Sequence, residues 1–438
     1  MMNKNQIQYP KVLIVSHNVL SNNTNMGRTL STYFSGWDRN AIAQLFFHSE
    51  IPTNPICENY YQFTDIDAVK SIICRKHQGK KLSKDDIRTD LEDAVNTGSL
   101  TGIYNYGRKR SPMIYLARDT VWTLAAWRCQ SLIDWIDRFN PDILFFASGD
   151  YEFAYQVTKS IAEERNIPLV VLCVDDYYLF NTNEKKIIGR YRYNRFMHTV
   201  RETMNYACCI LTMNEMMAGE YKRLFGKECY VLYTAAKKVP LYTGDKKGIA
   251  YIGGLGLNRD KQLIEIAKAL NEINEDKIPR RIDLYTGEKD PVILSRIKAE
   301  EGIDYHGQIS GDQVADTIQH SKAVIHTESF DPGIRKRVKY SLSTKIPDSI
   351  ASGTCMFAYG PEEVASIDYL IRNNAAFVAT SPDKIKTVLI RLFTDESEYK
   401  RIAENAYALA CRNHDGEKTT GFVLSLLTEK VKSFKENC

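Results

Sequence analysis

Short apolar runs alternate with amphipathic segments along most of this chain, and this alternation limits the folds that the chain can adopt. The runs lack the regularly spaced polar residues of a half-exposed strand, which is typical of parallel strands buried on both faces. Strands that alternate with helices build βαβ units. The pattern therefore predicts an α/β protein with doubly wound parallel sheets. The predicted strands are residues 11–16, 44–48, 142–148, 168–174 and 208–213 in the first half, and residues 249–253, 281–287, 323–328, 355–360 and 375–380 in the second half.

Several segments between these runs carry apolar residues at helical spacing. We expect one helix over Thr120–Phe139 and another over Glu152–Arg165. Apolar residues also recur at helical spacing between positions 263 and 273. Residues 396–438 contain no further strand signal, so we expect them to be helical, with a break at Asn413–Gly416.

The length of 438 residues favours two domains, because single hydrophobic cores rarely grow beyond roughly 250 to 300 residues. The stretch Ala236–Gly248 is rich in lysine and has no apolar period, so it is the predicted linker. It would separate a Rossmann-like domain over residues 1–235 from a second one over residues 249–410. Residues 411–438 are then a C-terminal helical segment. The charged segment 76–110 is expected to be an excursion from the first domain.

The composition excludes several classes of protein. Lys and Arg number 58 against 54 Asp and Glu, and this difference of +4 gives no support to a general nucleic-acid-binding surface. The ten cysteines contain no CxxC pair, which is typical of buried thiols rather than of a disulfide framework or a zinc site. The apolar runs are far shorter than the roughly 20 residues that cross a bilayer. These features predict a cytoplasmic protein without a transmembrane segment or a nucleic-acid partner.

A glycine-rich turn joins a predicted strand to a predicted helix in the second half. The strand ends in Gly253 and Gly254, and the helix starts with Arg259 and Lys261 close together. Glycines let backbone N–H groups approach an anion, and a helix N-terminus favours negative charge. Two nearby cations can neutralise a diphosphate. The alternative is a tight strand-to-helix turn whose charges are solvated.

Polar residues also follow a later strand of the same half. Glu328 lies at the carboxyl end of this strand, where open parallel sheets place their ligands, and His326 lies two residues earlier. Farther along, Ser343 or Thr344 can cap a helix whose N-terminus carries Lys345. The alternatives are a solvated ion pair for Glu328, a plain helix cap for the hydroxyl residues and a structural role for the histidine. Taken with the glycine-rich turn, these residues favour an anion site.

The second half resembles, over residues 205–410, the nucleotide-sugar-binding domain of retaining glycosyltransferases of family four, which have the GT-B fold. In that family a glycine-rich turn followed by Arg and Lys binds the diphosphate of the donor. The resemblance implies this role for Gly253, Gly254, Arg259 and Lys261. It also implies two domains that face each other across a cleft, with C-terminal helices that return toward the first domain.

The resemblance extends to the residues that would contact the donor. In the family, an acidic residue after a later strand contacts the donor sugar, which implies this role for Glu328. Ser343, Thr344 and Lys345 would hold a phosphate or the nucleoside, and His326 is a further candidate donor contact. One position departs from the family pattern, because Lys336 stands where a second Glu is usual, eight residues after the first.

The first half is similar to the acceptor-binding half of the same family. The loop after its first strand, residues 17–28, would line the acceptor side through Asn18, Gly27 and Arg28. Asp175 and Asp176 follow another strand, where many relatives have a histidine, and are candidate catalytic residues. The alternative is that both aspartates simply begin a turn. Because they are adjacent, they form no DxD metal motif, and we expect no bound metal.

The resemblance implies a hexosyltransferase that moves a sugar from a nucleotide diphosphate sugar to a glycan or lipid-linked glycan, with retention of configuration and without a cofactor. Other GT-B enzymes, such as epimerases and phosphorylases, and a non-catalytic glycan- or partner-binding protein on the same scaffold are the alternatives. The basic and aromatic stretch 185–196 leaves two interpretations open. It contacts anionic lipid at the inner face of a membrane, or it is an exposed helix whose aromatic side chains pack inward.

Overall fold

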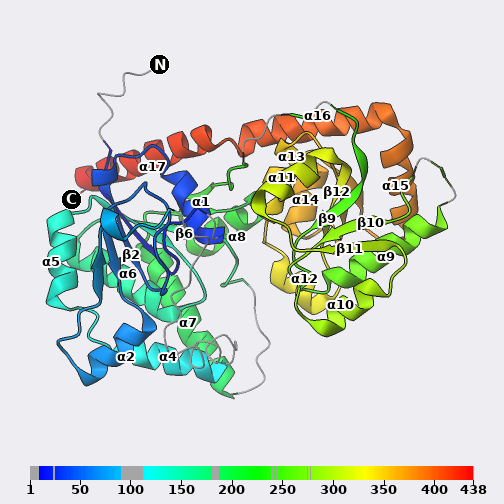
Figure 1. Ribbon diagram of the computed structural model, residues 1–438. Coiled ribbons are helices and arrows are strands. Elements are labelled where there is room, and N and C mark those ends of the chain that lie inside the picture. Colours follow the sequence, from blue (N-terminus) through cyan, green and yellow to red (C-terminus); the bar gives the residue numbers. More distant parts are fainter. Residues whose placement is uncertain are drawn as a thin grey trace. The chain divides into compact units, whose positions relative to one another are not determined.

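The computed structural model describes residues 9–22, 25–89, 112–179, 187–237, 241–242, 244–273, 275–276 and 278–437. The chain forms two compact units (Figure 1). Unit 1 consists of Met1–Leu232 and Gly416–Cys438, and unit 2 consists of Tyr233–Asp415. Each unit is built on a sheet of its own with surrounding helices. The predicted α/β class with two Rossmann-like parts is therefore confirmed.

The sheet of unit 1 has eight strands, whose bounds are β1 Val12–Ser16, β2 Ile42–Phe46, β3 Tyr60–Gln62, β4 Lys80–Leu82, β5 Ile143–Ala147, β6 Leu169–Cys173, β7 Cys209–Thr212 and β8 Cys229–Val231. Their order is β4-β3-β2-β1-β5-β6-β7-β8. All neighbouring strands are parallel except β3 and β4, which pair antiparallel. Every residue of β1, β2, β5, β6 and β7 is buried. Burial on both faces explains why the apolar runs in the sequence lack polar alternation.

The helices of unit 1 begin and end at residues that suit helix termini. Thr64 and Asp67 form a capping box at the start of α2, and the Asn214 side chain accepts a hydrogen bond from the Met217 backbone at the start of α8. Gly226, in the left-handed conformation, ends α8. The helices are α1 Asn25–Tyr33, α2 Asp65–Ile73, α4 Pro112–Leu124, α5 Gln130–Phe139, α6 Glu152–Arg165, α7 Ile187–Tyr206, α8 Glu215–Phe225 and α17 Gly416–Asn437.

The single helix predicted over Thr120–Phe139 is wrong, because parts of two helices, α4 and α5, share this stretch. Between them, the backbone N–H of Ala126 donates to the Ser71 hydroxyl of α2 (3.0 Å) rather than continuing the helix. A contact with a neighbouring helix has therefore overridden the local helical pattern. The helix predicted over Glu152–Arg165 is confirmed.

The last helix, α17, packs into the core of unit 1. Val423, Leu426 and Leu427 are buried in the same cluster as residues of β1 and β5. The Thr420 hydroxyl donates to the Thr32 carbonyl of α1 (3.0 Å), and α17 lies beside α1 in Figure 1. The C-terminal helix therefore returns to the unit that contains the first strand, as expected.

The sheet of unit 2 is parallel throughout, in the order β11-β10-β9-β12-β13-β14. Its strands are β9 Lys247–Ile252, β10 Ile282–Tyr285, β11 Ile303–Gly307, β12 Ser321–Thr327, β13 Cys355–Tyr359 and β14 Phe377–Ala379. The sequence pattern missed β11, because this edge strand is only partly buried and is mostly polar. The end of the predicted linker, Lys247 and Gly248, belongs to β9.

The predicted break near the C-terminus is confirmed, since α16, the last helix of unit 2, ends at Asn413 and α17 begins at Gly416. The Asp395 side chain caps α16 by accepting a hydrogen bond from the Glu398 backbone (2.9 Å). The helices are α9 Arg259–Glu272, α10 Pro291–Lys298, α11 Gly311–His320, α12 Pro332–Val338, α13 Lys345–Ala351, α14 Ala365–Arg372, α15 Ile385–Thr394 and α16 Glu396–Asn413.

The strand order reverses once in each sheet, beside the first long strand of the unit. In unit 1, β1 lies between β2 and β5, and in unit 2, β9 lies between β10 and β12. Open parallel sheets bind ligands outside the carboxyl ends of the strands at such a reversal. The residues that follow β1 and β5, and those that follow β9 and β12, are therefore the places to look for a site.

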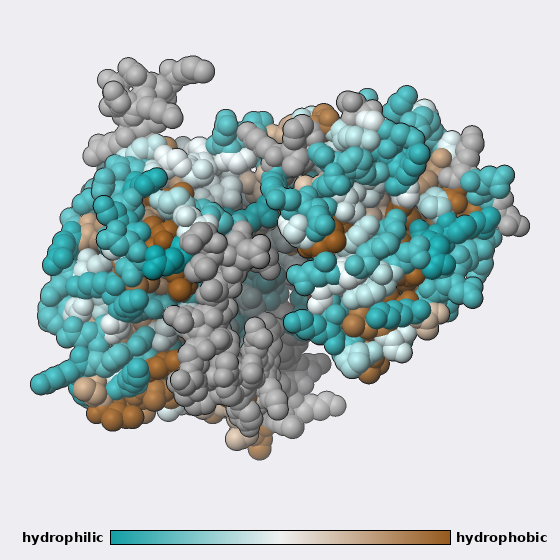
Figure 2. Space-filling view, in the orientation of Figure 1, coloured by the Kyte–Doolittle hydropathy of each residue, from teal (hydrophilic) through white to brown (hydrophobic). Residues whose placement is uncertain are grey.

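Most of the face shown in Figure 2 is hydrophilic, with hydrophobic surface at the end of unit 1 where α2 lies. Among the described residues, no helix is long and apolar enough to cross a membrane. The same residues contain no group of three or more His, Cys, Asp or Glu side chains that could hold a metal ion. All nine described cysteines are free thiols, and two of them, Cys74 and Cys411, are exposed rather than buried as predicted.

Candidate functional site

The candidate site of unit 2 lies where β9 and β12 end side by side. These strands pair directly, with Ile249 opposite Ala323. The glycine-rich turn follows β9, and Glu328 follows β12. The parallel sheet therefore brings together two segments that are some seventy positions apart in the sequence, as predicted for Gly253 and Glu328.

Glu328 is a buried carboxylate with three polar neighbours. Only 3% of the residue is exposed. Arg259 Nη2 lies 3.5 Å from both carboxylate oxygens, the Ser366 hydroxyl donates to Oε1 at 3.2 Å, and His326 Nε2 lies 3.4 Å from Oε1. Burial alone would raise the pKa of Glu328, but His326, Arg259 and Ser366 together lower it. Glu328 is therefore an ionised hydrogen-bond acceptor at neutral pH.

The helix start and a hydrogen bond to β12 together fix the position of the Arg259 side chain. It is the first residue of α9, and its Nε donates to the Thr327 carbonyl (3.3 Å) at the end of β12. Before it, Leu257 and Asn258 both adopt the left-handed conformation, with φ of 62° and 60°. This conformation is uncommon for a leucine and costs energy, and such strain is concentrated at functional sites. The strained turn directs Arg259 toward Glu328.

Lys345 reaches the glycine-rich turn from the start of α13. Gly253 has a φ of 149°, and a Cβ built on it would lie 1.5 Å from Lys345 Nζ, so only glycine leaves room for the ammonium group. The ammonium also lies 5.4 Å from the centre of the Tyr251 ring. Lys345 is exposed as a residue, and the glycine-rich turn and the Tyr251 ring are the neighbours of its ammonium group. Burial and the nearby Arg259 cation lower the pKa of Lys345 to about 8, against a smaller opposing effect of Glu328.

The other predicted donor contacts lie around this cluster. Lys261 is exposed in the first turn of α9, beside Arg259 in the sequence, and Gly254 accepts a hydrogen bond from the Tyr251 hydroxyl through its carbonyl (2.7 Å). Of the two residues predicted as a cap of α13, Thr344 stands at the N-cap position, but its backbone is helical and its side chain makes no cap hydrogen bond. The Ser343 hydroxyl is the nearer candidate cap, since it accepts from the Lys345 backbone N–H at 3.5 Å.

Two further residues contact Glu328: His326, which takes the structural role that the sequence left open, and Ser366. His326 is buried against Glu328, so it supports this carboxylate from inside the sheet. Ser366 comes from α14 and carried no sequence signal, because only the fold brings it to Glu328. Lys336, which stands at the position of the usual second Glu, is exposed on α12.

A second polar cluster lies at the strand reversal of unit 1, where the residues after β1 and β5 meet. The rings of His17 and Tyr151 are 4.4 Å apart, and the His48 ring lies 5.1 Å from His17. Burial, Arg118 and His48 hold the pKa of His17 well below its ordinary value, so His17 is neutral. The position of His17 directly after β1 was a signal that sequence reasoning could have used.

Asn18, a predicted acceptor-side residue, joins this cluster through Glu50. Its side-chain amide donates to both oxygens of Glu50, at 3.0 and 3.2 Å. The Val19 backbone N–H also donates to Glu50 (3.2 Å), and His48 Nδ1 lies 3.2 Å from it. Although burial opposes it, these contacts lower the pKa of Glu50. Glu50 is therefore a fixed anion beside His48.

Arginines and aromatic rings border the same cluster. The Arg118 guanidinium lies 4.1 Å from the centre of the Tyr151 ring and donates to Asp65 (2.8 Å). Arg192 lies 4.1 Å from the centre of the Tyr115 ring. Guanidinium groups above aromatic faces are attracted by the ring quadrupole. Arg118 and Tyr115 carried no sequence signal, whereas Arg192 belongs to the basic and aromatic stretch 185–196. Helices α4 and α7 bring these residues in from distant parts of the chain.

The structure places the other predicted residues of unit 1 as follows. Gly27 and Arg28 lie in the first turn of α1 and not in a loop, because the helix already begins at Asn25. Asp175 is exposed after β6. Asp176 is buried, and its Oδ1 accepts hydrogen bonds within a turn, which is the alternative that the sequence left open for it. The donors are the backbone of Tyr178 (3.0 Å), the backbone of Leu179 (2.6 Å) and the hydroxyl of Tyr221 (3.1 Å).

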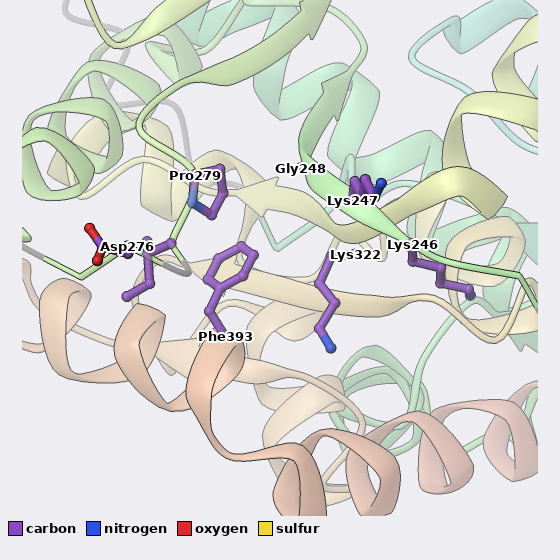
Figure 3. Close-up of a pocket in the computed structure, with 8 residues that line it drawn as sticks. Lys246, Lys247, Gly248, Asp276, Pro279, Lys322 and Phe393 are labelled. Atoms are coloured by element: carbon purple, nitrogen blue, oxygen red, sulfur yellow. The ribbon is translucent and has the colours of Figure 1, made fainter.

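A cavity of about 390 Å³ lies at the opposite edge of the unit 2 sheet, where β9 and β12 begin (Figure 3). Its lysines are bound to the protein itself, since Lys246 Nζ donates to the Gly353 carbonyl and the Thr354 hydroxyl (both 2.9 Å) and Lys322 pairs with Glu396 (3.0 Å). This cavity is therefore separate from the cluster around Glu328. The lining residues are Lys246, Lys247, Gly248, Asp276, Ile278, Pro279, Lys322 and Phe393.

Residues 261–424 match a family model described as glycosyl transferase-like. The matched region is less than half of the chain, lies mostly in unit 2 and contains Lys261, Glu328 and Lys345. No curated protein sequence matches the chain significantly.

Solved structures resemble the chain over nearly its whole length. Sucrose-phosphate synthase from Thermosynechococcus elongatus has 10% sequence identity, covers 96% of this chain and 99% of its own, and has a TM-score of 0.61. The Anabaena protein HepE in complex with UDP has 12% identity, with 96% and 100% covered and a TM-score of 0.58. TarM has 10% identity, with 97% and 99% covered and a TM-score of 0.60. At such low identities these similarities show the fold, which is GT-B.

We expect the Lys345 ammonium to titrate near pH 8 rather than near its ordinary value of 10.5, because its charged end is crowded and Arg259 lies nearby. The measurement is a pH titration of lysine amines by NMR after ¹³C-methylation, with Lys345→Arg to identify the signal by its loss. Arg259→Gln removes the neighbouring cation and should move the titration to higher pH. A Lys345 signal that titrates near 10.5 in the parent protein would contradict the described crowding.

Proposed function

We propose that this protein is a glycosyltransferase that moves a hexosyl group from a nucleotide diphosphate sugar to a glycan or lipid-linked glycan, with retention of anomeric configuration. The observation that carries the proposal is the cluster of Arg259, Lys345 and buried Glu328 at the strand reversal of unit 2. The glycosyl transferase-like match to residues 261–424 supports it. Structures of the similar protein HepE in complexes with UDP and with UDP-glucose support a donor of this class.

In the proposed donor complex, the diphosphate lies against the turn formed by Gly253 and Gly254. Arg259, Lys261 and Lys345 supply positive charge there. When the bond to the sugar breaks, negative charge develops on the departing diphosphate, and fixed cations in a partly desolvated site stabilise it. A bound diphosphate would also raise the pKa of Lys345 and keep its ammonium charged. In this proposal the three protein cations supply the positive charge that a metal ion supplies in other transferases.

Glu328 would orient the donor sugar. Because its pKa is lowered, it acts as an acceptor for sugar hydroxyl groups and not as a proton donor. Arg259 would then contact both the carboxylate and the diphosphate, since its guanidinium has five N–H donors. Ser343 and Thr344 would contact a phosphate or the nucleoside beside Lys345, and His326 would act through Glu328.

The acceptor would bind to unit 1. Asn18, Gly27 and Arg28 are the predicted acceptor-side residues. His17 precedes Asn18 in the sequence, and the cluster of His17 and Tyr151 lies at the strand reversal. Aromatic rings and neutral hydrogen-bonding groups suit a sugar, which has both apolar faces and hydroxyl groups. Asp175 remains the proposed catalytic residue on this side, since the carboxylate of Asp176 is buried and accepts hydrogen bonds within its turn.

The second candidate function is a non-catalytic protein that binds a glycan or another partner on the same scaffold. Exposed Lys336, at the position of the usual second Glu, is the observation that favours it. Turnover of a nucleotide sugar separates the two candidates, since a binding protein would bind the donor and leave it intact. We place the proposed activity in the cytoplasm, with peripheral contact at the inner face of a membrane and without a cofactor.

Nucleoside diphosphates should bind unit 2 through Arg259 and Lys261. A charge-assisted contact contributes about 1.5 to 3 kcal/mol, so Arg259→Ala or Lys261→Ala should weaken affinity roughly ten- to hundredfold. Calorimetry with UDP and GDP measures this. Lys268→Ala is the matched control, because Lys268 is exposed farther along α9 and should not matter. Folded Arg259 and Lys261 variants that bind as tightly as the parent would refute the proposed diphosphate site.

Glu328→Gln should greatly lower turnover with less effect on the binding of free nucleotide, because Glu328 would contact the sugar. NMR of the product should show the anomeric configuration of the donor. The contrary result has three parts. The product has the opposite configuration, the Glu328→Gln variant is active, and the Asp175→Asn or the Asp176→Asn variant is inactive. That outcome would assign the chemistry to a base in unit 1.

Turnover should not need a divalent ion, because Arg259, Lys261 and Lys345 would supply the positive charge near the leaving group. Assays with EDTA, and then with added manganese or magnesium, test this. Activity that EDTA abolishes and that either metal restores would show that protein cations do not suffice.

A further inference from the structure

Exposed apolar side chains gather on three helices of unit 1. In the part of the chain that the structure describes, fourteen large apolar side chains are exposed, and nine of them belong to α2, α4 and α7. α4 packs against both α2 and α7. We call this surface the α2–α4–α7 face. The other five side chains are single residues on separate elements. The nine are Ile66, Val69, Ile72, Ile73, Met113, Leu124, Ile187, Ile188 and Tyr191.

The apolar residues of α2 form a stripe that faces water. Ile66, Val69 and Ile73 are spaced three and four residues apart, which places them on one side of the helix. Ile73 is 85% exposed, whereas Ala68 and Ser71, on the other side, are fully buried. Figure 2 shows hydrophobic surface at the place of α2 in Figure 1. An exposed apolar stripe of this kind is typical of an interaction site.

The charge presented beside this stripe is positive. The two acidic residues of α2 are occupied within unit 1, since Asp65 accepts from Arg118 and Trp122 (both 2.8 Å) and Asp67 contacts His77 (2.6 Å). Exposed cations stand on the helix and on the segment that follows it. They are Lys70, Arg75, Lys76, Lys80 and Lys81, of which Lys80 lies 3.9 Å from Asp86.

The start of α7 adds to the face. The two interpretations of the basic and aromatic stretch 185–196 therefore apply to different parts of it. Lys185 and Lys186 lie outside the described residues. Phe196 is buried, and Arg195 pairs with Glu152 (2.7 Å), so this part packs inward. Tyr191 is 58% exposed on the first turns of the helix. Only the N-terminal part of α7 therefore presents apolar surface to water.

We propose that the α2–α4–α7 face docks on a membrane surface that contains anionic lipid. Isoleucine side chains on a helix can enter the boundary between headgroups and acyl chains, while lysines and arginines beside them reach lipid phosphates. Protein interfaces, in contrast, are depleted of lysine at their centres. The combination of an apolar stripe with flanking lysines therefore fits a lipid surface better than a second protein. This inference does not depend on the proposed transferase activity.

The test is co-sedimentation of the full chain with vesicles of phosphatidylcholine, alone or mixed with phosphatidylglycerol. The parent protein should bind the mixed vesicles, and added salt should weaken binding. The double substitution Val69→Ser and Ile73→Ser should weaken it at least roughly tenfold, because apolar burial is lost. Changing Lys70, Arg75 and Lys76 to Gln should weaken binding roughly fivefold for each charge.

Matched controls lie in unit 2. Val292→Ser removes an apolar side chain that is 65% exposed on α10, and Lys400→Gln removes an exposed cation on α16. Both variants should bind vesicles as the parent does. Far-UV circular dichroism should show that all variants are folded, because the substituted side chains are exposed.

Hydrogen exchange of the unmodified chain gives a readout that needs no variant. Mixed vesicles should protect α2 and the first turns of α7. Three results would overturn the proposal: equal binding to both kinds of vesicle, no binding to either, or unchanged binding by the Val69 and Ile73 double variant. Sedimentation velocity tests the alternative that a second copy of the chain covers this face. If the parent protein is a dimer and the double variant is a monomer, the face is an interface between copies of the chain, and the proposal is overturned.

Discussion

Parallel pairing is the constraint on which both polar clusters depend. Every strand of unit 2 points the same way, so the residues that follow each strand collect at one edge of the sheet. The reversal of strand order beside β9 leaves space between the crossover connections at this edge. Gly253 and Glu328 meet there because they follow neighbouring strands. The reversal beside β1 brings His17 and Tyr151 together in unit 1 by the same rule.

The charges around Glu328 explain why the polar residues of unit 2 are packed as they are. One buried carboxylate faces the guanidinium of Arg259 at 3.5 Å and the imidazole of His326 at 3.4 Å, and both stabilise its ionised form. Burial, and then the nearby Arg259 cation, lower the pKa of Lys345 to about 8. Arg259 and Lys345 therefore oppose a single negative charge. An anion of the diphosphate class would restore the balance, and this is the physical basis for placing the donor there.

The sequence predicted the buried central strands, the glycine-rich turn and the position of Glu328 after a strand, because these depend on local pattern and on the rule for parallel sheets. It missed the short or partly exposed strands β3, β4, β8 and β11. It failed where contacts between distant segments decide the outcome. The helix expected over Thr120–Phe139 breaks because Ser71, from α2, accepts a hydrogen bond in its middle. Ser366 and Arg118 enter the two clusters from helices whose own sequences carry no sign of it. Those positions follow only from the folded chain.

One run of contacts joins the polar cluster of unit 1 to the α2–α4–α7 face. Asp65, the first residue of α2, accepts from Arg118 of α4 (2.8 Å). The Arg118 guanidinium lies above the Tyr151 ring (4.1 Å), and this ring lies against His17 (4.4 Å). Because charged hydrogen bonds and ring contacts are short-ranged and directional, the run fixes α2 relative to the residues after β1 and β5. A lipid surface that held α2 would therefore stand at a defined position relative to the proposed acceptor site, which is the geometry that a lipid-linked acceptor requires.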